Sequence, residues 1–269
     1  MKIDLYKSLE KYILEEDLWN NLEDALGNLD YDQLEQDSSI FYLGYGDENW
    51  RDSANHDYQN MIEDSLSFTE NLKKEFNKWI IDLDINITKL DSLSGIIRSN
   101  NVYINFNYTD TLERVYSIPE NRVTYIHCKA NRGEELILGH HDSSYWNKND
   151  VSKMNDSEYA AYMEYQSERD FRDIEAKQII AAYFKRTYKD TKEIIEIHKN
   201  LFLSLKNAKN IYVLGHSLSE IDFDYFKEIR KNVPDNCNWY ISYYSSEDYK
   251  KALKLIKILD IYNYNFFEI

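Results

Sequence analysis

The first 90 residues place apolar side chains at helical spacing. In "LYKSLEKYILEEDLWNNLEDAL", which begins at Leu5, apolar residues recur every three or four positions. The stretch "MIEDSLSFTENLKKEFNKWIIDL" carries a similar stripe and predicts one amphipathic helix over residues 61–83. A polar stretch from Gly44 to Asp57 separates the two patterns. We therefore expect residues 1–90 to form a helical region.

From residue 101 onward the pattern changes to short apolar runs. Near-continuous runs of this kind fit strands that are buried on both faces of a parallel sheet. The runs are "VYINF" (102–106), "VTYIH" (123–127), "LILG" (136–139), "IYVLG" (211–215) and "WYISYY" (239–244). Helical patterns follow several of them, from Asp110 onward, over Glu220–Lys231 and over Glu247–Leu259. This alternation predicts an α/β fold with a doubly wound, mostly parallel sheet.

A long helical block lies between the predicted strands, from about Ser157 to Leu205. We expect two helices, broken near Lys189–Asp190, that pack beside or over the sheet. No stretch rich in Pro, Gly or Ser marks a domain boundary. The expectation is a single α/β domain over 1–269. Its parts are a helical region (1–90), a sheet core (101–145 and 207–269) and a helical insertion (155–206).

Charge and cysteine content narrow the function classes. The chain has 32 Lys and Arg against 48 Asp and Glu, a formal net charge of −16. Such a field repels phosphate backbones, so we expect no nucleic-acid binding, although a local basic pocket stays open. Cys128 and Cys237 lie far apart without metal-ligand spacing, as expected of reduced thiols in the cytoplasm. No apolar run approaches the ~20 residues of a membrane span, so we predict a cytoplasmic protein without membrane contact.

Polar residues follow the first predicted strand in "NYTDTLE", Asn107–Glu113. Thr109 or Asp110 can act as the N-cap of the next helix, with Glu113 reaching back from the capping-box position. Capping accounts for Asp110 but leaves Asn107 unexplained, because a cap needs only one such residue. The alternative is that this segment binds a ligand.

Histidines mark the ends of the next two runs. His127 ends one run, and His140 and His141 follow Gly139 at the end of the other, with Asp142 beside them. A single His at such a position is often a structural residue, but three at neighbouring strand ends favour a functional site. The spacing matches no tight metal-ligand pattern, so we expect no metal.

The run "IYVLG" is followed by a third polar cluster. Gly215 lets the backbone approach a ligand, and His216 and Ser217 precede a helix whose start is marked by Ser219 or Glu220. Free N–H groups at a helix start suit a phosphate or ribose oxygen. Asp222 and Asp224 in the first turn complement the helix dipole, and Asp222 can also reach inward. The string "GHSLS" departs from a nucleophile elbow because Ser219 replaces its final Gly.

Four motifs, "FNYTDTLERVY", "YIHCKA", "LILGHHD" and "YVLGHSLSEIDFDYF", together resemble the AbiH family of bacterial abortive-infection proteins. Their order and spacing are also similar to the family pattern, over roughly Trp19 to Ile229. The family in turn resembles sirtuin-like NAD-binding domains. The resemblance implies a Rossmann-like sheet, a role in phage defence with a phage-derived trigger, and NAD as substrate or ligand.

The resemblance also implies roles for single residues. Asn107 would position water or ribose beside the nicotinamide bond, His127 would be the catalytic base, and Asp110 would supply negative charge. The sirtuin-like aspartate falls on Thr109, one place before Asp110, and the Gly that usually follows the histidine is Cys128 here. The expected nucleotide-contacting residues are Thr109, Gly139, His140, Gly215, His216, Ser217 and Asp222.

The start of the chain departs from the family pattern. AbiH proteins usually open with a strand and a "G-N-G-F-D" loop, whereas this chain opens with a helical pattern. The nearest string, "LGYGDEN" at Leu43–Asn49, is out of order. We expect either a segment upstream of Met1 or loss of the first strand.

Three functions are consistent with these features. The first is hydrolysis of the glycosidic bond of NAD or a related nucleotide, which would arrest an infected cell. The second is a nucleotide sensor without turnover. The third is a protein-interaction component whose acidic helical face contacts a basic partner. The oligomeric state is open between a monomer and a homo-oligomer.

Overall fold

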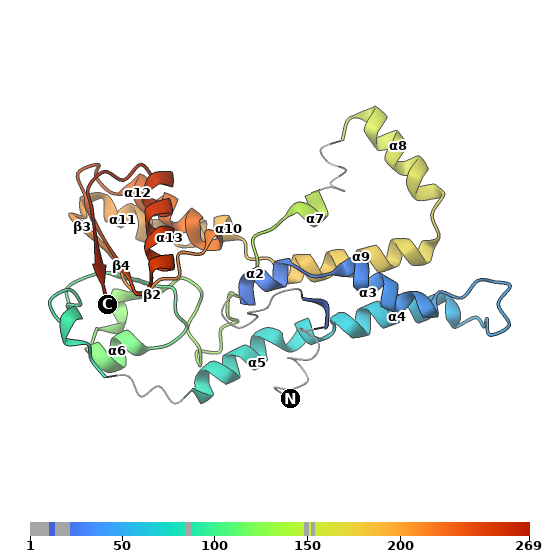
Figure 1. Cartoon of the computed structure of the whole chain (residues 1–269), viewed down its shortest axis with the longest axis horizontal. Helices are drawn as coiled ribbons and strands as arrows, with labels where there is room; N and C mark the ends of the chain where they lie inside the picture. The colour runs from blue at the N-terminus through green and yellow to red at the C-terminus, as the bar shows by residue number, and fades with distance from the viewer. Residues whose placement is uncertain (1–10, 14–21, 84–87, 148–150, 152–153) are drawn as a thin grey trace. The chain divides into compact units, whose positions relative to one another are not determined.

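The computed structural model describes residues 11–13, 22–83, 88–147, 151 and 154–269. The chain divides into two compact units, whereas the sequence pattern suggests a single α/β domain. Unit 1 comprises Met1–Phe76 and Ile137–Lys189, and unit 2 comprises Asn77–Leu136 and Asp190–Ile269. Figure 1 shows helices in unit 1 and all described strands in unit 2.

Unit 1 is built from helices. Its elements are α2 (Leu22–Gly27), α3 (Tyr31–Ser38), η1 (Ser39–Phe41), α4 (Ala54–Leu66), α7 (Ser144–Asn147), α8 (Asp156–Ser167) and α9 (Phe171–Arg186), and α5 (Phe68–Asp82) runs on into unit 2. Helices α4 and α9 pack against each other, and their facing apolar side chains share one core. This core includes Ile62 and Leu66 from α4 and Ile180 and Tyr183 from α9, each 1% exposed or less. Burial of such side chains contributes about 1.5–3 kcal/mol each.

The single helix predicted over residues 61–83 is two helices, α4 and α5, which meet at Ser67. Ser67 Oγ donates to the Asp64 carbonyl at 2.7 Å, and Thr69 Oγ1 donates to the Leu66 carbonyl at 2.8 Å. Hydroxyl groups that bond to nearby backbone compete with the helical ladder. The apolar stripe alone did not reveal this break.

Arg172 fixes the first turn of α9 to the loop after η1. Its buried guanidinium donates to Asp170 Oδ2 at 2.7 Å and to the Leu43 carbonyl at 2.7 Å. It also lies 3.9 Å from the ring centre of Tyr42. The planar group therefore satisfies a carboxylate, a carbonyl and a ring face at once.

We expect Arg172→Lys to lower the free energy of unfolding by about 1.5–3 kcal/mol, because an ammonium cannot reproduce these charged hydrogen bonds. Chemical denaturation of the two proteins measures the difference. The matched control is Arg51→Lys, since the Arg51–Asp57 ion pair at 2.9 Å involves an exposed arginine and such surface pairs contribute little. Equal losses in the two variants would contradict the importance of the buried guanidinium.

Unit 2 contains two short parallel sheets. Its strands are β1 (Tyr103–Asn105), β2 (Val123–Tyr125), β3 (Asn210–Val213), β4 (Asn238–Tyr243) and β5 (Tyr264–Glu268). β1 pairs with β2, and the second sheet has the order β3-β4-β5. Its helical elements are η2 (Asp91–Leu93), α6 (Thr111–Tyr116), η3 (Glu120–Arg122), α10 (Thr191–Ile197), α11 (Lys199–Ser204), η5 (Leu205–Asn207), η6 (Glu220–Asp222), α12 (Phe223–Asn232) and α13 (Ser246–Ile258). The mixed α/β class is confirmed.

Four of the five predicted strands are present, and the fifth prediction was wrong. The run at 136–139 forms no strand, because the chain beside it pairs with the end of α9. His140 N–H donates to the Thr187 carbonyl at 2.9 Å, and Lys189 N–H donates to the His140 carbonyl at 2.7 Å.

The strand β5 was not predicted from the sequence. It is mostly exposed, as befits the edge of a sheet, and so lacks an apolar run.

The helical block contains four helices, α8 to α11, rather than the predicted two. The predicted break near Lys189–Asp190 is confirmed, since α9 ends at Arg186 and α10 begins at Thr191. Asp170 and Asp190 are N-caps whose carboxylates accept from backbone N–H groups of α9 and α10. None of the described helices has the length and apolar content needed to cross a membrane.

Candidate functional site

In unit 2, residues just beyond the carboxyl ends of β1, β2 and β3 lie around one aromatic ring, that of Phe106. Phe106 directly follows β1, His127 lies two residues after β2, and His216 lies three residues after β3. The ring centre of Phe106 is 5.6 Å from that of His127 and 4.5 Å from that of His216. Both histidines predicted at strand ends in this unit therefore lie at one place.

Asp222 lies between these two histidines. Its Oδ1 is 3.7 Å from His127 Nε2, and its Oδ2 is 3.5 Å from His216 Nε2. The side chains of His127, His216 and Asp222 are 4%, 8% and 9% exposed. We call these three residues the His–Asp–His cluster. A buried carboxylate between two imidazoles can orient both rings and stabilise a proton on either of them.

The chain reaches this arrangement through the turn before α12. Asp222 occupies the N-cap position of α12, but its side chain makes no capping hydrogen bond. The preceding 3₁₀ turn, η6, instead directs Asp222 inward, and the residue is 6% exposed. The prediction that Asp222 can reach inward is confirmed.

The tautomer of neutral His216 follows from its backbone contact. The Leu218 N–H donates to His216 Nδ1 at 2.8 Å, so Nδ1 is the acceptor and Nε2 carries the proton. That proton faces the carboxylate of Asp222. Gly215, at φ +58°, adopts the left-handed conformation that glycine tolerates, and its N–H donates to Ser242 Oγ at 2.9 Å. This turn holds His216 in place.

Aromatic side chains surround the cluster. The Tyr225 ring centre is 5.5 Å from that of His127, and the Phe226 ring centre is 5.1 Å from that of His216. Phe106 contacts both of these rings, at 5.5 Å and 5.8 Å. Apolar rings of this kind lower the local dielectric, so electrostatic interactions among the three side chains are screened less than in bulk water.

Asn105, rather than Asn107, is the buried asparagine at the end of β1. Asn105 Oδ1 accepts from the Asn107 N–H at 3.0 Å, and its Nδ2 donates to the Thr109 carbonyl at 3.3 Å. The Asn107 side chain is exposed. Sequence reasoning missed Asn105, whose signal was a polar residue at the last position of an apolar strand. A ligand-contacting role for Asn107 stays a prediction.

The predicted capping box at the start of α6 was wrong. Asp110 is at the N-cap position without a side-chain cap, and its Oδ1 lies 3.5 Å from Arg114 Nε. Glu113 accepts from the Tyr125 hydroxyl at 2.7 Å and from Lys129 Nζ at 3.2 Å instead. Burial and this carboxylate raise the pKa of Tyr125 far above its usual range. Glu113 thus connects α6 to β2, and a catalytic role for Asp110 stays a prediction.

Two further residues predicted to contact a nucleotide, Thr109 and Ser217, lie on the turns after β1 and β3. Thr109 Oγ1 lies 3.0 Å from Thr111 Oγ1, at the start of α6. Ser217 is exposed beside His216. The structure therefore brings His127, His216 and Asp222 together, with Gly215 and Ser217 on the adjoining turn.

Comparison with known proteins places the chain in a family. The family model described as bacteriophage abortive infection AbiH matches residues 2–243. The chain belongs to the AbiH family. Membership implies a function in bacteriophage abortive infection. No curated protein and no solved structure matches the chain.

Two residues predicted to contact nucleotide in this AbiH chain, Gly139 and His140, belong to unit 1. Their contacts there are with the end of α9 and with α2, where the Gly139 N–H donates to Glu23 Oε1 at 3.4 Å. A Cβ on Gly139 would lie 2.1 Å from the Thr187 carbonyl oxygen, and His140 Nε2 lies 3.1 Å from the Phe184 carbonyl oxygen. These contacts give both residues a structural role, and nucleotide contact stays a prediction for them.

Burial lowers the pKa of His140 below its ordinary value of 6.5. The unfolded chain therefore binds a proton more readily than the folded one, and stability falls as the pH drops below about 6.5. We expect His140→Gln to weaken this dependence, measured as melting temperature between pH 7.5 and 5.5. The exposed neighbour supplies the control, since His141→Gln should leave the slope as in the wild type. An unchanged slope in His140→Gln would contradict the assignment.

Cys128 explains one departure from the family pattern. Its φ is +68°, in the left-handed region that glycine adopts at least cost. A glycine at this position in related sequences would therefore meet a backbone requirement of the turn after His127. Among the described residues, no three His, Cys, Asp or Glu side chains are arranged to hold a metal ion.

Proposed function

We propose that the His–Asp–His cluster belongs to a catalytic site that hydrolyses the N-glycosidic bond of NAD or a related nucleotide. The observation that carries this proposal is the position of Asp222 between two imidazoles where the ends of β1, β2 and β3 meet. In open α/β sheets, ligands bind beyond the carboxyl ends of the strands. The proposal includes a doubly wound, sirtuin-like arrangement of these strands.

The reaction needs a base for water and stabilisation of a cationic ribose. The bond between nicotinamide nitrogen and ribose C1′ breaks, and its electron pair leaves with neutral nicotinamide. Water oxygen bonds to C1′, and its proton passes to His127. The carboxylate of Asp222 stabilises the protonated imidazole, as expected for a buried acid–base pair. The products are nicotinamide, ADP-ribose and a proton.

The other site residues predicted from the sequence have the following roles in the proposed reaction. Asn107, exposed just after β1, orients the attacking water or the ribose. Asp110 and Thr109 lie at the start of α6 and supply polar contacts on the ribose side. Gly215 and Ser217 lie on the turn that holds His216. The space beside Gly215 lets the phosphates approach the backbone, and Ser217 contacts them through its backbone N–H.

The distribution of charge supports an anionic ligand in unit 2. Unit 2 has 18 Lys and Arg against 20 Asp and Glu, a net charge of −2, whereas unit 1 has 14 against 28, a net charge of −14. Most of the negative charge of the chain therefore belongs to residues of unit 1. A nucleotide phosphate meets little net repulsion from unit 2.

The test is incubation of the purified full chain with NAD in H₂¹⁸O, followed by mass spectrometry of the products. Hydrolysis predicts nicotinamide and ADP-ribose with ¹⁸O at C1′. Asp222→Asn is similar in size but uncharged. It should lower the rate of nicotinamide release by about 10²-fold or more, since acid–base groups contribute about 10²–10⁴-fold. NAD binding without release of nicotinamide would overturn hydrolysis in favour of a sensor.

A further inference from the structure

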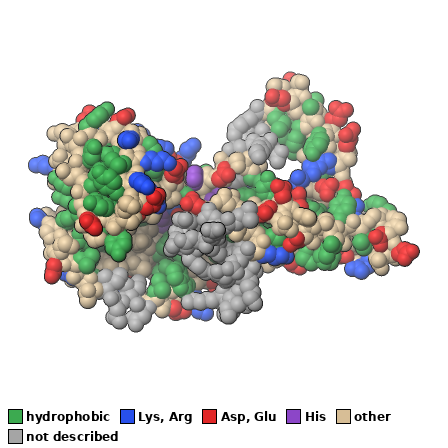
Figure 2. Space-filling view, in the orientation of Figure 1, with side chains coloured by type: hydrophobic (Ala, Val, Ile, Leu, Met, Phe, Trp, Pro, Cys, Tyr) green, Lys and Arg blue, Asp and Glu red, His purple; other side chains and the backbone are tan. Residues whose placement is uncertain are grey.

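A groove runs between α4 and α9 in the acidic unit 1. Figure 2 shows Asp and Glu side chains spread over the helices of this unit. The groove has a volume of ≈ 360 Å³. Its lining residues recur at intervals of one helical turn on both helices, and they are His56, Gln59, Asn60 and Glu63 of α4 and Glu175, Gln178, Ile179 and Ala182 of α9. Two of these side chains are carboxylates and none is a Lys or Arg.

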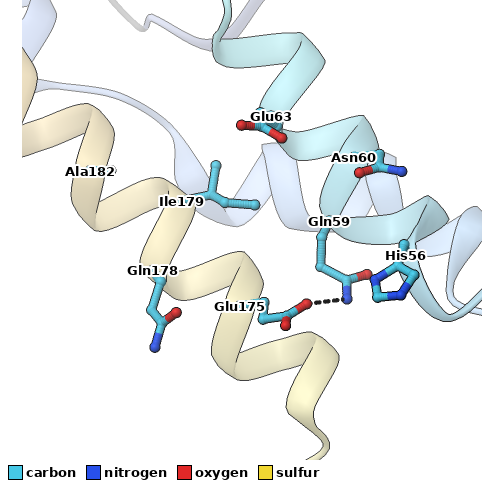
Figure 3. Close-up of a pocket in the computed structure, with 8 residues that line it drawn as sticks. All are labelled: His56, Gln59, Asn60, Glu63, Glu175, Gln178, Ile179 and Ala182. Atoms are coloured by element: carbon cyan, nitrogen blue, oxygen red, sulfur yellow. Dashed lines mark hydrogen bonds between the residues drawn. The ribbon is translucent and has the colours of Figure 1, made fainter.

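Gln59 at the base of this groove is 4% exposed, and its amide orientation is fixed by its donor group. Nε2 donates to the Asn55 carbonyl at 2.9 Å and to Glu175 Oε2 at 2.9 Å, so both of its protons have acceptors. Oε1 therefore occupies the other side of the amide, as Figure 3 shows. This oxygen is buried and has no hydrogen-bond partner among the described residues. A buried acceptor without a donor costs free energy, and a ligand that donates to it recovers that cost.

We propose that the α4–α9 groove docks a basic helical segment of a partner protein. An arginine or lysine of that segment donates to Gln59 Oε1, and neighbouring cations pair with Glu63 and Glu175. The spacing of the lining residues matches side chains presented every three to four positions by a helix laid along the groove. The net charge of −14 on unit 1 attracts a basic segment. This site lies in unit 1 and is independent of the nucleotide site.

The probes are two synthetic helical peptides of about 20 residues, built on alanine, with arginine or glutamate at every fourth position. Fluorescence anisotropy measures their binding to the full chain at low and physiological salt. The arginine peptide should bind with a dissociation constant below 1 mM and weaken as salt rises, because the contact is electrostatic. The glutamate peptide should not bind.

Variants locate the binding to the groove. The double variant Glu63→Gln and Glu175→Gln removes two charges while keeping an acceptor for Gln59, and should weaken the arginine peptide about tenfold. Gln59→Met removes the buried acceptor and should weaken it at least threefold. The control pair, Glu70→Gln with Glu164→Gln, removes two exposed charges elsewhere in unit 1 and should bind as the wild type. Melting curves confirm that each variant is folded.

Three results would overturn the proposal. One is the absence of binding by the arginine peptide. Another is equal weakening in the groove pair and the control pair, which would show attraction to the whole acidic unit. The last is unchanged binding by a folded Gln59→Met variant. None of these results bears on nicotinamide release, so the failure of either proposal is distinguishable from that of the other.

Discussion

His127→Ala is expected to lower nicotinamide release by about 10²–10⁴-fold and to remove protection against phage. His127 is 3% exposed, and its Nε2 lies 3.7 Å from Asp222 Oδ1, so alanine removes the residue that we propose as the base. Turnover is measured with purified protein, and protection is measured as plaque formation on cells that express each variant.

The control for this prediction is His141→Gln, which changes an exposed histidine of unit 1. It should retain wild-type turnover and protection. Expression levels and melting temperatures of both variants are compared, because the His127→Ala substitution also leaves a small cavity beside Phe106 and Tyr225. A folded His127→Ala variant with wild-type turnover would exclude His127 as the base.

The second large effect concerns the stability of unit 1. In Gly139→Ala the new Cβ would lie 2.1 Å from the Thr187 carbonyl oxygen and 2.9 Å from its carbon. These are backbone atoms, so the bridge between His140 and Tyr188 has to move. We expect a loss of about 3 kcal/mol in the free energy of unfolding, at the upper end of overpacking costs. Urea denaturation measures it.

Gly44→Ala is the matched control. No heavy atom lies within 4 Å of a Cβ built on Gly44, and its φ is not in the left-handed region. Its free energy of unfolding should stay within about 0.5 kcal/mol of the wild type. If Gly139→Ala were as stable as Gly44→Ala, the close packing of residue 139 against α9 would be contradicted.

An apolar run correctly predicted a strand only where the buried segment also pairs with another strand. The run at 136–139 has the composition of a strand, yet Leu136 and Leu138 are buried at 1% and 4% in an irregular segment. β5 shows the opposite case, because an edge strand with exposed Tyr264 needs no continuous apolar pattern. Apolar runs report burial, and pairing partners decide the secondary structure.

The candidate site was partly readable from the sequence. His127, His216 and Asp222 were identified because each lies just after a strand or at the following helix start. The sequence could not show that Asn105 is buried and Asn107 exposed, because this depends on how the chain turns after β1. Likewise, the preference of Glu113 for Tyr125 depends on the pairing of β1 with β2 and on the position of α6.

The division into two units was not visible in the sequence pattern. Helices α4 and α9 are about 100 residues apart along the chain, and periodicity shows that each has an apolar stripe without showing which stripes meet. Their pairing creates a helical core that includes Ile62 and Ile180. The insertion predicted over 155–206 is therefore shared between the units, with its boundary after Lys189.

The most direct test of the account is the NAD content of infected cells. Cells that express the wild-type chain or Asp222→Asn at equal protein levels are infected with phage, and NAD is measured over the infection cycle. We expect a steep fall in NAD with the wild type, together with protection, and neither effect with Asp222→Asn. Protection by the wild type at constant NAD, or an equal fall in both, would contradict it.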